Sequence, residues 1–328
     1  MSDATGPALV VTRHGGIDVL AVQQRPAPEP GAGEVLVEVA AAGVNFIDVY
    51  QREGVYPTTP PFVSGNEGAG TVLEVGDGVE GLHVGDRVAW PQGPGSAAAV
   101  AALPAAGLVL VPDAVDLETA AAVMLQGLTA QYLTTSTYAV HPGDVALVHA
   151  AAGGVGQLLV PLVRARGGTV VATAGGPEKC ETARTVGAEH VIDYRSVDDL
   201  GGEVRRITDG RGVDVAYDGV GKDTFDASLA SLRPRGMLVL FGAASGQVPP
   251  FDIQRLNRAG SIFLSRPALA HHLATREELQ WRAGEVLGAV ADGSLHVAVG
   301  GRYPLAEAAS AYAELEGRRT QGKLLLIP

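Results

Sequence analysis

The sequence predicts a two-domain α/β protein, in which one domain has a doubly wound parallel sheet and the other is a mainly β, partly open barrel. From Val145 onward, short apolar runs alternate with helix-patterned segments, which is typical of a parallel sheet covered by helices. Before about Leu110, shorter runs are broken by Gly and Pro, which indicates strands joined by turns. A length of 328 residues is enough for two such cores.

The expected strands of the mainly β domain lie between about Leu9 and Leu110. Examples of strands are Val35–Val39, Gly70–Val75 and Arg87–Trp90, and examples of turns are Pro28–Gly33 and Gly76–Gly78. A closing segment from about Arg266 holds helices and ends in the apolar run Leu324–Ile327. We expect this run to return to the first domain.

The elements of the parallel sheet follow one another as strand, helix, strand. Pro177 suits the first turn of a helix and Gly187 its end. The expected strands are Val145–Val148, Thr169–Ala174, His190–Tyr194, Val213–Tyr217, Met237–Phe241 and Ser261–Ser265. The expected helices follow Gly156 and span Pro177 to Gly187, Asp198–Thr208 and about Thr224–Leu232. This alternation predicts right-handed crossovers within one sheet.

The stretch from Val145 to Gly156 joins a strand to a glycine-rich turn. Ala151, Gly153 and Gly156 have the spacing of the dinucleotide fingerprint G-x-G-x-x-G, with alanine in place of the first glycine. The apolar residues that follow recur at helical spacing, and they are Val155, Leu158, Leu159, Leu162 and Val163. Backbone N–H groups and a positive helix end at this turn suit a pyrophosphate. The alternative is an ordinary strand-to-helix turn, because the chain has 44 glycines.

The end of the next strand predicts which dinucleotide binds. An Asp or Glu about 20 residues after the turn commonly binds the ribose 2′-hydroxyl of NAD, but Val171–Ala174 ends without an acid. Lys179 follows, and Tyr194 ends the next strand. Because a cation there attracts a 2′-phosphate, the sequence favours NADPH. The alternative for Lys179 is a solvated lysine on a helix face, although the chain has only three lysines.

Composition and charge restrict the function classes. The formal net charge of −12 argues against a nucleic-acid-binding surface. No apolar run is long enough to cross a bilayer, and the first residues lack a signal-peptide pattern. The single cysteine, Cys180, cannot form an internal disulfide, which fits a reducing compartment. We therefore expect a cytoplasmic protein without nucleic-acid or membrane partners.

Motifs along nearly the whole chain resemble one enzyme family. They include Ala41–Pro57, Pro61–Val79, Gly85–Trp90, Gln126–Leu133, His149–Gly156, Tyr217–Gly221, Phe241–Gly246, Ser265–Pro267 and Arg318–Pro328. Together they resemble the zinc-free quinone oxidoreductase (ζ-crystallin-like) branch of the medium-chain dehydrogenase/reductase superfamily. The resemblance implies a GroES-like catalytic and substrate domain of residues 1–126 and 266–328. It also implies an NADPH-binding Rossmann domain of residues 127–265.

Zinc-dependent members of this superfamily bind a catalytic zinc through Cys and His, and this chain lacks those residues. By resemblance the first ligand position falls near Asn45, and the usual Gly-His-Glu reads Gly65-Asn66-Glu67. No cysteine precedes Cys180, so the sequence predicts neither a catalytic nor a four-cysteine structural zinc site. Without a Lewis acid the acceptor must take hydride readily, as a quinone or an activated enone does. The expected reaction is transfer of hydride or electrons from NADPH to a quinone bound between the two domains.

The resemblance also implies the roles of individual residues. Asn45 and Tyr50 are the implied catalytic residues beside the nicotinamide, where they can donate to a quinone oxygen that gains charge. Tyr50 or solvent supplies the proton, and Tyr56 and Arg266 lie at the pocket edge. The implied cofactor-binding residues are Gly153, Gly154, Val155 and Gly156 at the pyrophosphate, Gly175, Lys179 and Tyr194 at the adenosine phosphate, Phe241, Gly242 and Ser245 at the nicotinamide, and Arg318 from the closing segment.

Plainer interpretations stay open for several of these residues. Asn45 is alternatively a turn residue, Tyr50 and Tyr56 are packing aromatics, and Arg318 is a surface arginine. Two other functions also remain. One is an enoyl or alkenal reductase of the same superfamily, and the other is a non-catalytic NADPH-binding protein of a stress or crystallin type.

Two further expectations concern the edge of the sheet and the pocket. The last strand, Ser261–Ser265, is expected at a sheet edge, and an open edge predicts a homodimer formed through that strand. Alanines at Ala97–Ala99 stand where relatives commonly have an aromatic residue. They predict a wider mouth of the substrate pocket.

Overall fold

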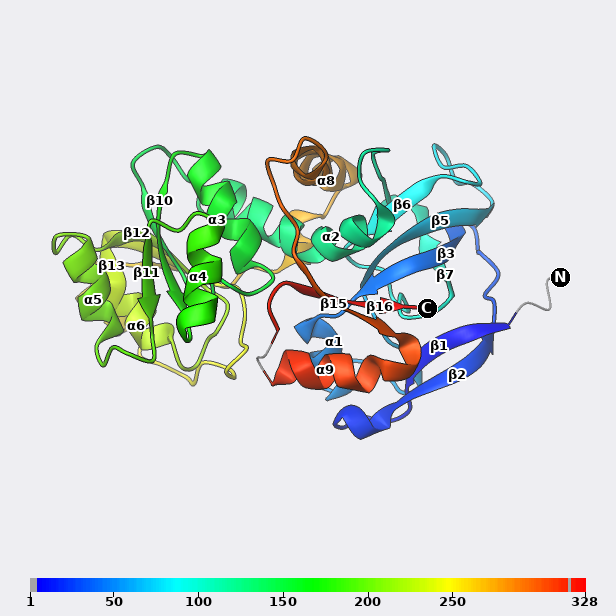
Figure 1. The fold of residues 1–328 in the computed structure, drawn as a ribbon, viewed down its shortest axis with the longest axis horizontal. Coiled ribbons are helices and arrows are strands. Elements are labelled where there is room, and N and C mark those ends of the chain that lie inside the picture. Colours follow the sequence, from blue (N-terminus) through cyan, green and yellow to red (C-terminus); the bar gives the residue numbers. More distant parts are fainter. Residues whose placement is uncertain (1–4, 318–319) are drawn as a thin grey trace. The chain divides into compact units, whose positions relative to one another are not determined.

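The computed structural model describes residues 5–317 and 320–328. The chain forms two compact units, whose elements are labelled in Figure 1. The β-rich unit comprises Met1–Leu128 and Thr275–Pro328, and the α/β unit comprises Thr129–Ala274. Among the described residues, no helix is long and apolar enough to cross a membrane.

The β-rich unit is organised around the long strand β3 (Glu34–Gly43). β3 pairs antiparallel with β5 (Glu67–Val75), with β7 (Val100–Pro104) and with β16 (Lys323–Ile327). The larger sheet has the order β15-β16-β3-β5-β6-β8, and the smaller sheet has the order β2-β1-β4. The remaining strands are β1 (Thr5–Val11), β2 (Leu20–Pro26), β4 (Phe62–Val63), β6 (Arg87–Trp90), β8 (Val109–Leu110) and β15 (Val299–Pro304). Because β16 pairs with β3, the predicted return of the closing run is confirmed.

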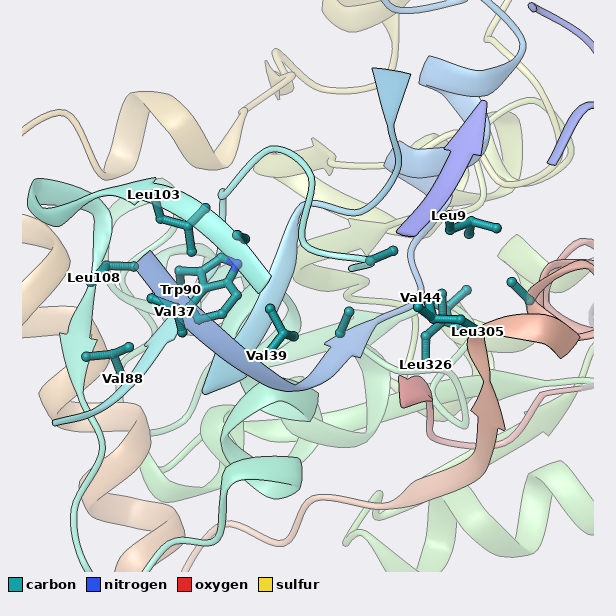
Figure 2. Packing of buried hydrophobic residues seen from close by; sticks show 14 of the residues in the cluster. Leu9, Val37, Val39, Val44, Val88, Trp90, Leu103, Leu108, Leu305 and Leu326 are labelled. Carbon is teal, nitrogen blue, oxygen red and sulfur yellow. The ribbon is translucent and has the colours of Figure 1, made fainter. Parts of the chain in front are cut away.

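Helices and a buried tryptophan complete the β-rich unit. The helices are α1 (Phe46–Arg52), α2 (Leu117–Tyr132, which continues into the α/β unit), α8 (Arg276–Ala291) and α9 (Ala308–Glu316), with short 3₁₀ turns at Ile17–Val19, Ala105–Gly107 and Leu305–Glu307. Trp90 is fully buried, and its indole N–H donates to the Ser96 hydroxyl at 2.7 Å. Figure 2 shows Val37 and Leu103 close to its ring. A buried aromatic of this size, with its N–H bonded, stabilises the interior strongly.

The α/β unit contains the predicted parallel sheet. Its strands are β9 (Val145–Val148), β10 (Thr169–Ala174), β11 (His190–Asp193), β12 (Val213–Asp218), β13 (Leu232–Leu240) and β14 (Phe263–Ser265). All are parallel, in the order β11-β10-β9-β12-β13-β14. Counted from β9 this is the order 3-2-1-4-5-6 of a Rossmann sheet, which confirms the predicted fold class.

The helices of the α/β unit pack on this sheet in two groups. They are α3 (Gly156–Ala165), α4 (Pro177–Thr185), α5 (Leu200–Ile207), α6 (Phe225–Ser231) and α7 (Gln254–Arg258), with a π-helical turn at Leu133–Thr137 and a 3₁₀ turn at Leu269–His272. α3 and α4 contact each other and the strands β9 to β11, whereas α5 packs on α6, which contacts β12 and β13.

In the parallel sheet, the first residues of two strands differ from the sequence prediction. β13 begins at Leu232 instead of Met237, because Leu232 pairs with Val213 before the register shifts. The shift lies at a charged segment that contains Pro234 and Arg235, and Arg235 has a φ of 59°. In the sequence, these residues conceal the first part of β13, because a bulge interrupts its pairing with β12 at this point. β14 begins at Phe263, two residues later than expected.

Candidate active site

The glycine-rich turn joins the end of β9 to the start of α3. The Gly153 amide donates to the Ala150 carbonyl at 2.8 Å, and Ala150 has a left-handed φ of 50°. A Cβ on Gly156 would lie 2.5 Å from the Ala150 oxygen and 2.6 Å from Ala151 Cα. Only glycine fits this close approach of helix to strand, as the third glycine of a dinucleotide turn requires. The turn also carries the other predicted pyrophosphate residues, Gly154 and Val155.

The residues predicted for the adenosine phosphate lie together where β10 and β11 end. Gly175 directly follows β10, and the Tyr194 hydroxyl occupies the space in which a Cβ on Gly175 would lie. Gly176 has a φ of 90° and donates its amide to Asp193 Oδ1 at 3.0 Å. Lys179 lies in the first turn of α4, half-buried. The structure therefore brings these three predicted residues to one corner of the sheet.

Lys179 shares this corner with a cation that the sequence analysis missed. Burial and the charge of Arg195 lower the pKa of Lys179. The Arg195 guanidinium lies 3.1 Å from the position of a Cβ on Gly176. The two cations repel each other, and an anion bound by both offsets the repulsion. The signal was present in the sequence, because Arg195 directly follows Tyr194.

The predicted nicotinamide residues lie on the loop after β13, packed against the loop after β12. The Ser245 hydroxyl donates to the Val220 carbonyl at 2.8 Å. A Cβ on Gly219 would lie 2.8 Å from a ring carbon of Phe241, and a Cβ on Gly242 would overlap the Gly219 carbonyl. These loops follow the carboxyl ends of two parallel strands, where open α/β sheets bind their ligands.

Asn45 directly precedes α1 in the β-rich unit and is buried. Its side-chain oxygen accepts from Lys323 Nζ at 2.7 Å and from Gln126 Nε2 at 2.6 Å. Its amide nitrogen donates to the Gly43 carbonyl at 3.1 Å and to Glu67 Oε2 at 2.9 Å. Two donors and two acceptor positions are all that a primary amide offers, so these contacts within the chain use them fully.

Asp48, in the first turn of α1, is buried and, like Glu67, is hydrogen-bonded to Asn45. Its carboxylate accepts from the backbone N–H of Asn45 at 2.9 Å, from Asn66 Nδ2 at 2.6 Å and from the Tyr312 hydroxyl at 3.2 Å. Burial raises the pKa of Asp48 to about 6, while these hydrogen bonds and the Lys323 charge limit the rise. The charge of this carboxyl therefore changes well above the usual range for aspartate.

The two tyrosines predicted at the substrate lie on α1 and shortly after it. The Tyr50 and Tyr56 rings meet edge to face, with centroids 5.4 Å apart, and the Phe46 ring lies 6.2 Å from Tyr50. Tyr50 is half-buried and Tyr56 is 37% exposed. Asn45 is next to this aromatic group in the chain. A cluster of rings that reaches solvent can pack against a flat aromatic substrate.

Two predicted site residues lie apart from these clusters in the chain. Arg266 directly follows β14 in the α/β unit, where it is exposed and its guanidinium donates to the Pro267 carbonyl at 3.2 Å. Arg318 lies outside the described residues 5–317 and 320–328.

Comparison with known proteins places the chain in a family. Residues 31–144 match the alcohol dehydrogenase GroES-like domain, and residues 154–279 match the zinc-binding dehydrogenase family. A quinone oxidoreductase of Pseudomonas aeruginosa is 44% identical over 96% of this chain and 97% of its own. The chain belongs to the quinone oxidoreductase branch of the medium-chain dehydrogenase/reductase superfamily. The family indicated by the sequence motifs is thereby confirmed.

Two other members of the superfamily are similar along nearly their whole length. The structure of Escherichia coli quinone oxidoreductase complexed with NADPH has a TM-score of 0.95 and 40% identity, covering 98% of this chain and 100% of that one. A 2-haloacrylate reductase of Burkholderia sp is 43% identical, covering 98% of both chains. The superfamily fold, with a GroES-like domain and a Rossmann sheet, is thus present in this chain.

The zinc positions of the superfamily can be tested on the residues of this chain. Within residues 5–317 and 320–328, no group of three His, Cys, Asp or Glu side chains is arranged to hold a metal ion. Around Asn45, a carboxylate and two amides surround the Lys323 ammonium. Zinc prefers thiolate, imidazole and carboxylate ligands, and a buried ammonium repels it. These residues do not fit a zinc ion.

The alanine-rich stretch lies inside the β-rich unit of this superfamily member. Ala97 and Ala98 are 0% and 6% exposed. The Leu9 amide donates to the Ala97 carbonyl at 2.8 Å, and the Val39 amide donates to the Ala99 carbonyl at 3.0 Å. The stretch therefore links β1 to β3, and small side chains permit this close packing. The wider pocket mouth that these alanines suggested stays a prediction.

Proposed function

We propose that the protein is an NADPH-dependent quinone oxidoreductase that works without zinc. The pair of cations Lys179 and Arg195, beside the glycines that follow β10, carries this proposal. A 2′-phosphate near this pair offsets the repulsion between the two charges, and NAD lacks that phosphate. The Escherichia coli relative supports the same cofactor, because its structure is a complex with NADPH.

The residues present fit the dinucleotide, because Gly156 leaves the space that a close approach of the backbone requires. NADPH, when bound, supplies a hydride to the acceptor. The amides at the start of α3 bind the pyrophosphate, and Lys179 and Arg195 bind the 2′-phosphate. Tyr50 and Tyr56 hold the flat acceptor. The Tyr50 hydroxyl donates to the acceptor oxygen that gains charge, and Tyr50 or water delivers the proton.

A steady-state assay with a panel of quinones tests the proposal. The protein is dialysed against a chelator, and oxidation of NADPH by benzoquinones and naphthoquinones is compared with oxidation of NADH. We expect turnover of quinones with NADPH at a higher kcat/KM than with NADH. Activity that is lost on chelation and returns with zinc contradicts the zinc-free mechanism. Equal kcat/KM for NADH contradicts the assignment of the cofactor.

A second candidate function is reduction of an activated carbon–carbon double bond. It is favoured by the similarity to the Burkholderia 2-haloacrylate reductase. Stopped-flow oxidation of NADPH by naphthoquinones, by unsaturated aldehydes and by 2-haloacrylate separates the two reactions. NADPH binding without turnover of any of these acceptors identifies the third candidate, a non-catalytic binding protein.

We also propose a homodimer formed through β14 and a cytoplasmic location. β14 is the last strand in the order of the six-stranded sheet, and its residues Phe263 and Leu264 are 59% and 36% exposed. An exposed apolar edge strand is suited to pairing with its copy. Cys180 is a free thiol, which fits a reducing compartment. A monomeric mass by light scattering at micromolar concentration contradicts the dimer.

A further inference from the structure

A buried lysine lies at the centre of the Asn45 cluster. Lys323 is the first residue of β16, and its side chain is 3% exposed. Its ammonium donates to Asn45 Oδ1 at 2.7 Å, to Gln126 Oε1 at 2.8 Å and to Glu67 Oε2. An ammonium has three protons, and here each has an acceptor inside the protein. Burial lowers the pKa of Lys323, while the neighbouring Glu67 charge counteracts this.

The backbone is shaped to accommodate this ion pair. A Cβ on Gly43 would overlap the Glu67 carboxylate and lie 2.7 Å from Lys323 Cε. Gly43 lies at the end of β3, where it pairs with Leu325 of β16. The other carboxylate oxygen of Glu67 accepts from the Leu125 amide at 2.6 Å. Three segments distant in the chain therefore close around one ammonium.

The ion pair fixes the orientation of the Asn45 amide. The Asn45 oxygen faces the Lys323 ammonium, and its nitrogen faces the Glu67 carboxylate. Rotating the amide by half a turn would place its N–H groups against the ammonium and its oxygen against the carboxylate. Asn45 also directly precedes α1, the helix that carries Tyr50. A displacement of the ammonium is therefore transmitted to the start of that helix.

We propose that Lys323 is an internal cation that replaces a metal ion in this site. By resemblance, zinc-ligand positions fall near Asn45 and at Asn66, and the Lys323 ammonium binds the side chains of Asn45 and of Glu67, which directly follows Asn66. Lys323 then acts as a positioning residue for reduction, through Asn45 and the start of α1. Asn45 supports the site by its fixed position, since both of its N–H groups have acceptors in the chain. This inference rests on the proposed quinone reduction.

A pair of variants separates positioning from charge balance. Lys323→Met alone leaves the Glu67 carboxylate buried without its cation, so the protein can fail to fold. Lys323→Met combined with Glu67→Gln removes both charges together. We expect this double variant to melt close to the wild type and to bind NADPH with a Kd within about twofold, while kcat for the quinone falls at least about tenfold. A double variant with wild-type kcat overturns the proposal, because Lys323 then only balances Glu67.

A matched control variant and a measurement that does not depend on activity complete the test. Arg282→Met removes another buried cation of the same unit, one that pairs with Glu278 on α8, and we expect it to lower the melting temperature without lowering kcat. The chain has only three lysines, so native reductive methylation can be assigned to each. We expect the exposed Lys222 to react and Lys323 to react only after unfolding. Methylation of Lys323 at the rate of Lys222 overturns the proposal.

The two measurements, kcat for the quinone and methylation of Lys323, also distinguish failure of this inference from failure of the proposed function. Wild-type protein that reduces no quinone contradicts the proposed function. The protection of Lys323 then decides the internal cation separately, because it is measured without turnover. Protection supports the cation, and rapid methylation overturns it.

Discussion

The hydroxyl of Ser228 donates a 2.7 Å hydrogen bond to Asp218 Oδ2, and both side chains are fully buried. The Ser228 oxygen lies 2.9 Å from His149 Nε2, and the Thr173 hydroxyl lies 3.0 Å from His149 Nδ1. Because the Ser228 proton goes to Asp218, the Ser228 oxygen accepts from Nε2–H of His149. Burial lowers the pKa of His149 and so favours the neutral ring, to whose Nδ1 the Thr173 hydroxyl donates. This chain of bonds fixes the strand end from which the glycine turn departs.

We predict that Ser228→Ala destabilises the protein by about 1–3 kcal/mol, because it leaves the buried His149 N–H without an acceptor and removes a bond to a carboxylate. Ser231→Ala is the matched control. Ser231 is also buried on α6, but its hydroxyl donates only to the Ala227 carbonyl of its own helix. Its loss is expected to cost less than about 1 kcal/mol. Urea unfolding measures both values, and equal losses would show that the His149 chain adds nothing.

The close contact at Gly156 gives a prediction for cofactor binding. In Gly156→Ala, the new Cβ would lie 2.5 Å from a backbone oxygen of the turn, so the turn or the helix must shift. We expect the Kd for NADPH to rise at least about tenfold, since a shift of this kind misplaces the donors to the pyrophosphate. Gly284→Ala, on α8 with open space around it, is the control. It is expected to leave the Kd unchanged and to stabilise its helix by up to about 1 kcal/mol.

The parallel sheet could be predicted largely from the sequence because its central strands β9, β10 and β12 are buried on both faces. Such strands appear as short apolar runs between helical segments, and Thr169–Ala174 is β10 with the predicted bounds. The start of β13 could not be predicted in this way. Arg233 and Pro234 look like a turn, yet they follow a strand start that pairs with Val213.

The parts of the candidate site that lie within short segments of the chain could be predicted from the sequence. The part that joins distant segments could not. The glycine turn and the corner with Lys179 lie within short segments and carry their own signals. The Asn45 cluster does not, because Lys323 is 278 positions from Asn45 and 256 from Glu67 along the chain. Nothing in the apolar run after Lys323 indicates that Lys323 itself lies at the end of β3. Only the pairing of β16 with β3 brings these residues together.

The cationic corner predicts the preference between NADPH and NADH. Lys179→Ala removes one of two neighbouring charges that we assign to the 2′-phosphate. We expect the Kd for NADPH to rise about tenfold or more, as loss of a charge-assisted bond implies, and the Kd for NADH to stay within about twofold. Arg195→Ala is expected to act in the same direction. Fluorescence titration with both nucleotides checks this, and equal weakening for NADH would indicate a structural defect.

Asp48 predicts how stability depends on pH. Its pKa rises on folding from 3.8 to about 6, so the folded state favours the protonated carboxyl. The stability that this group contributes is fully present below pH 3.8 and is lost as the pH rises through about 6. A difference of about two pKa units corresponds to about 3 kcal/mol. We expect Asp48→Asn, which stays neutral, to gain stability relative to the wild type by up to this amount between about pH 4 and pH 7.

An aspartate with the opposite shift provides the control for this prediction. Hydrogen bonds from Thr119 outweigh burial and lower the pKa of Asp116 below 3.8. Its contribution is therefore present above pH 3.8 and is lost as the pH falls through its lowered pKa. Relative to the wild type, Asp116→Asn is expected to lose stability as the pH rises, while Asp48→Asn gains it. Urea unfolding of both variants from about pH 2 to about pH 7 measures the two slopes. Slopes of the same sign would mean that Asp48 is not held protonated by burial.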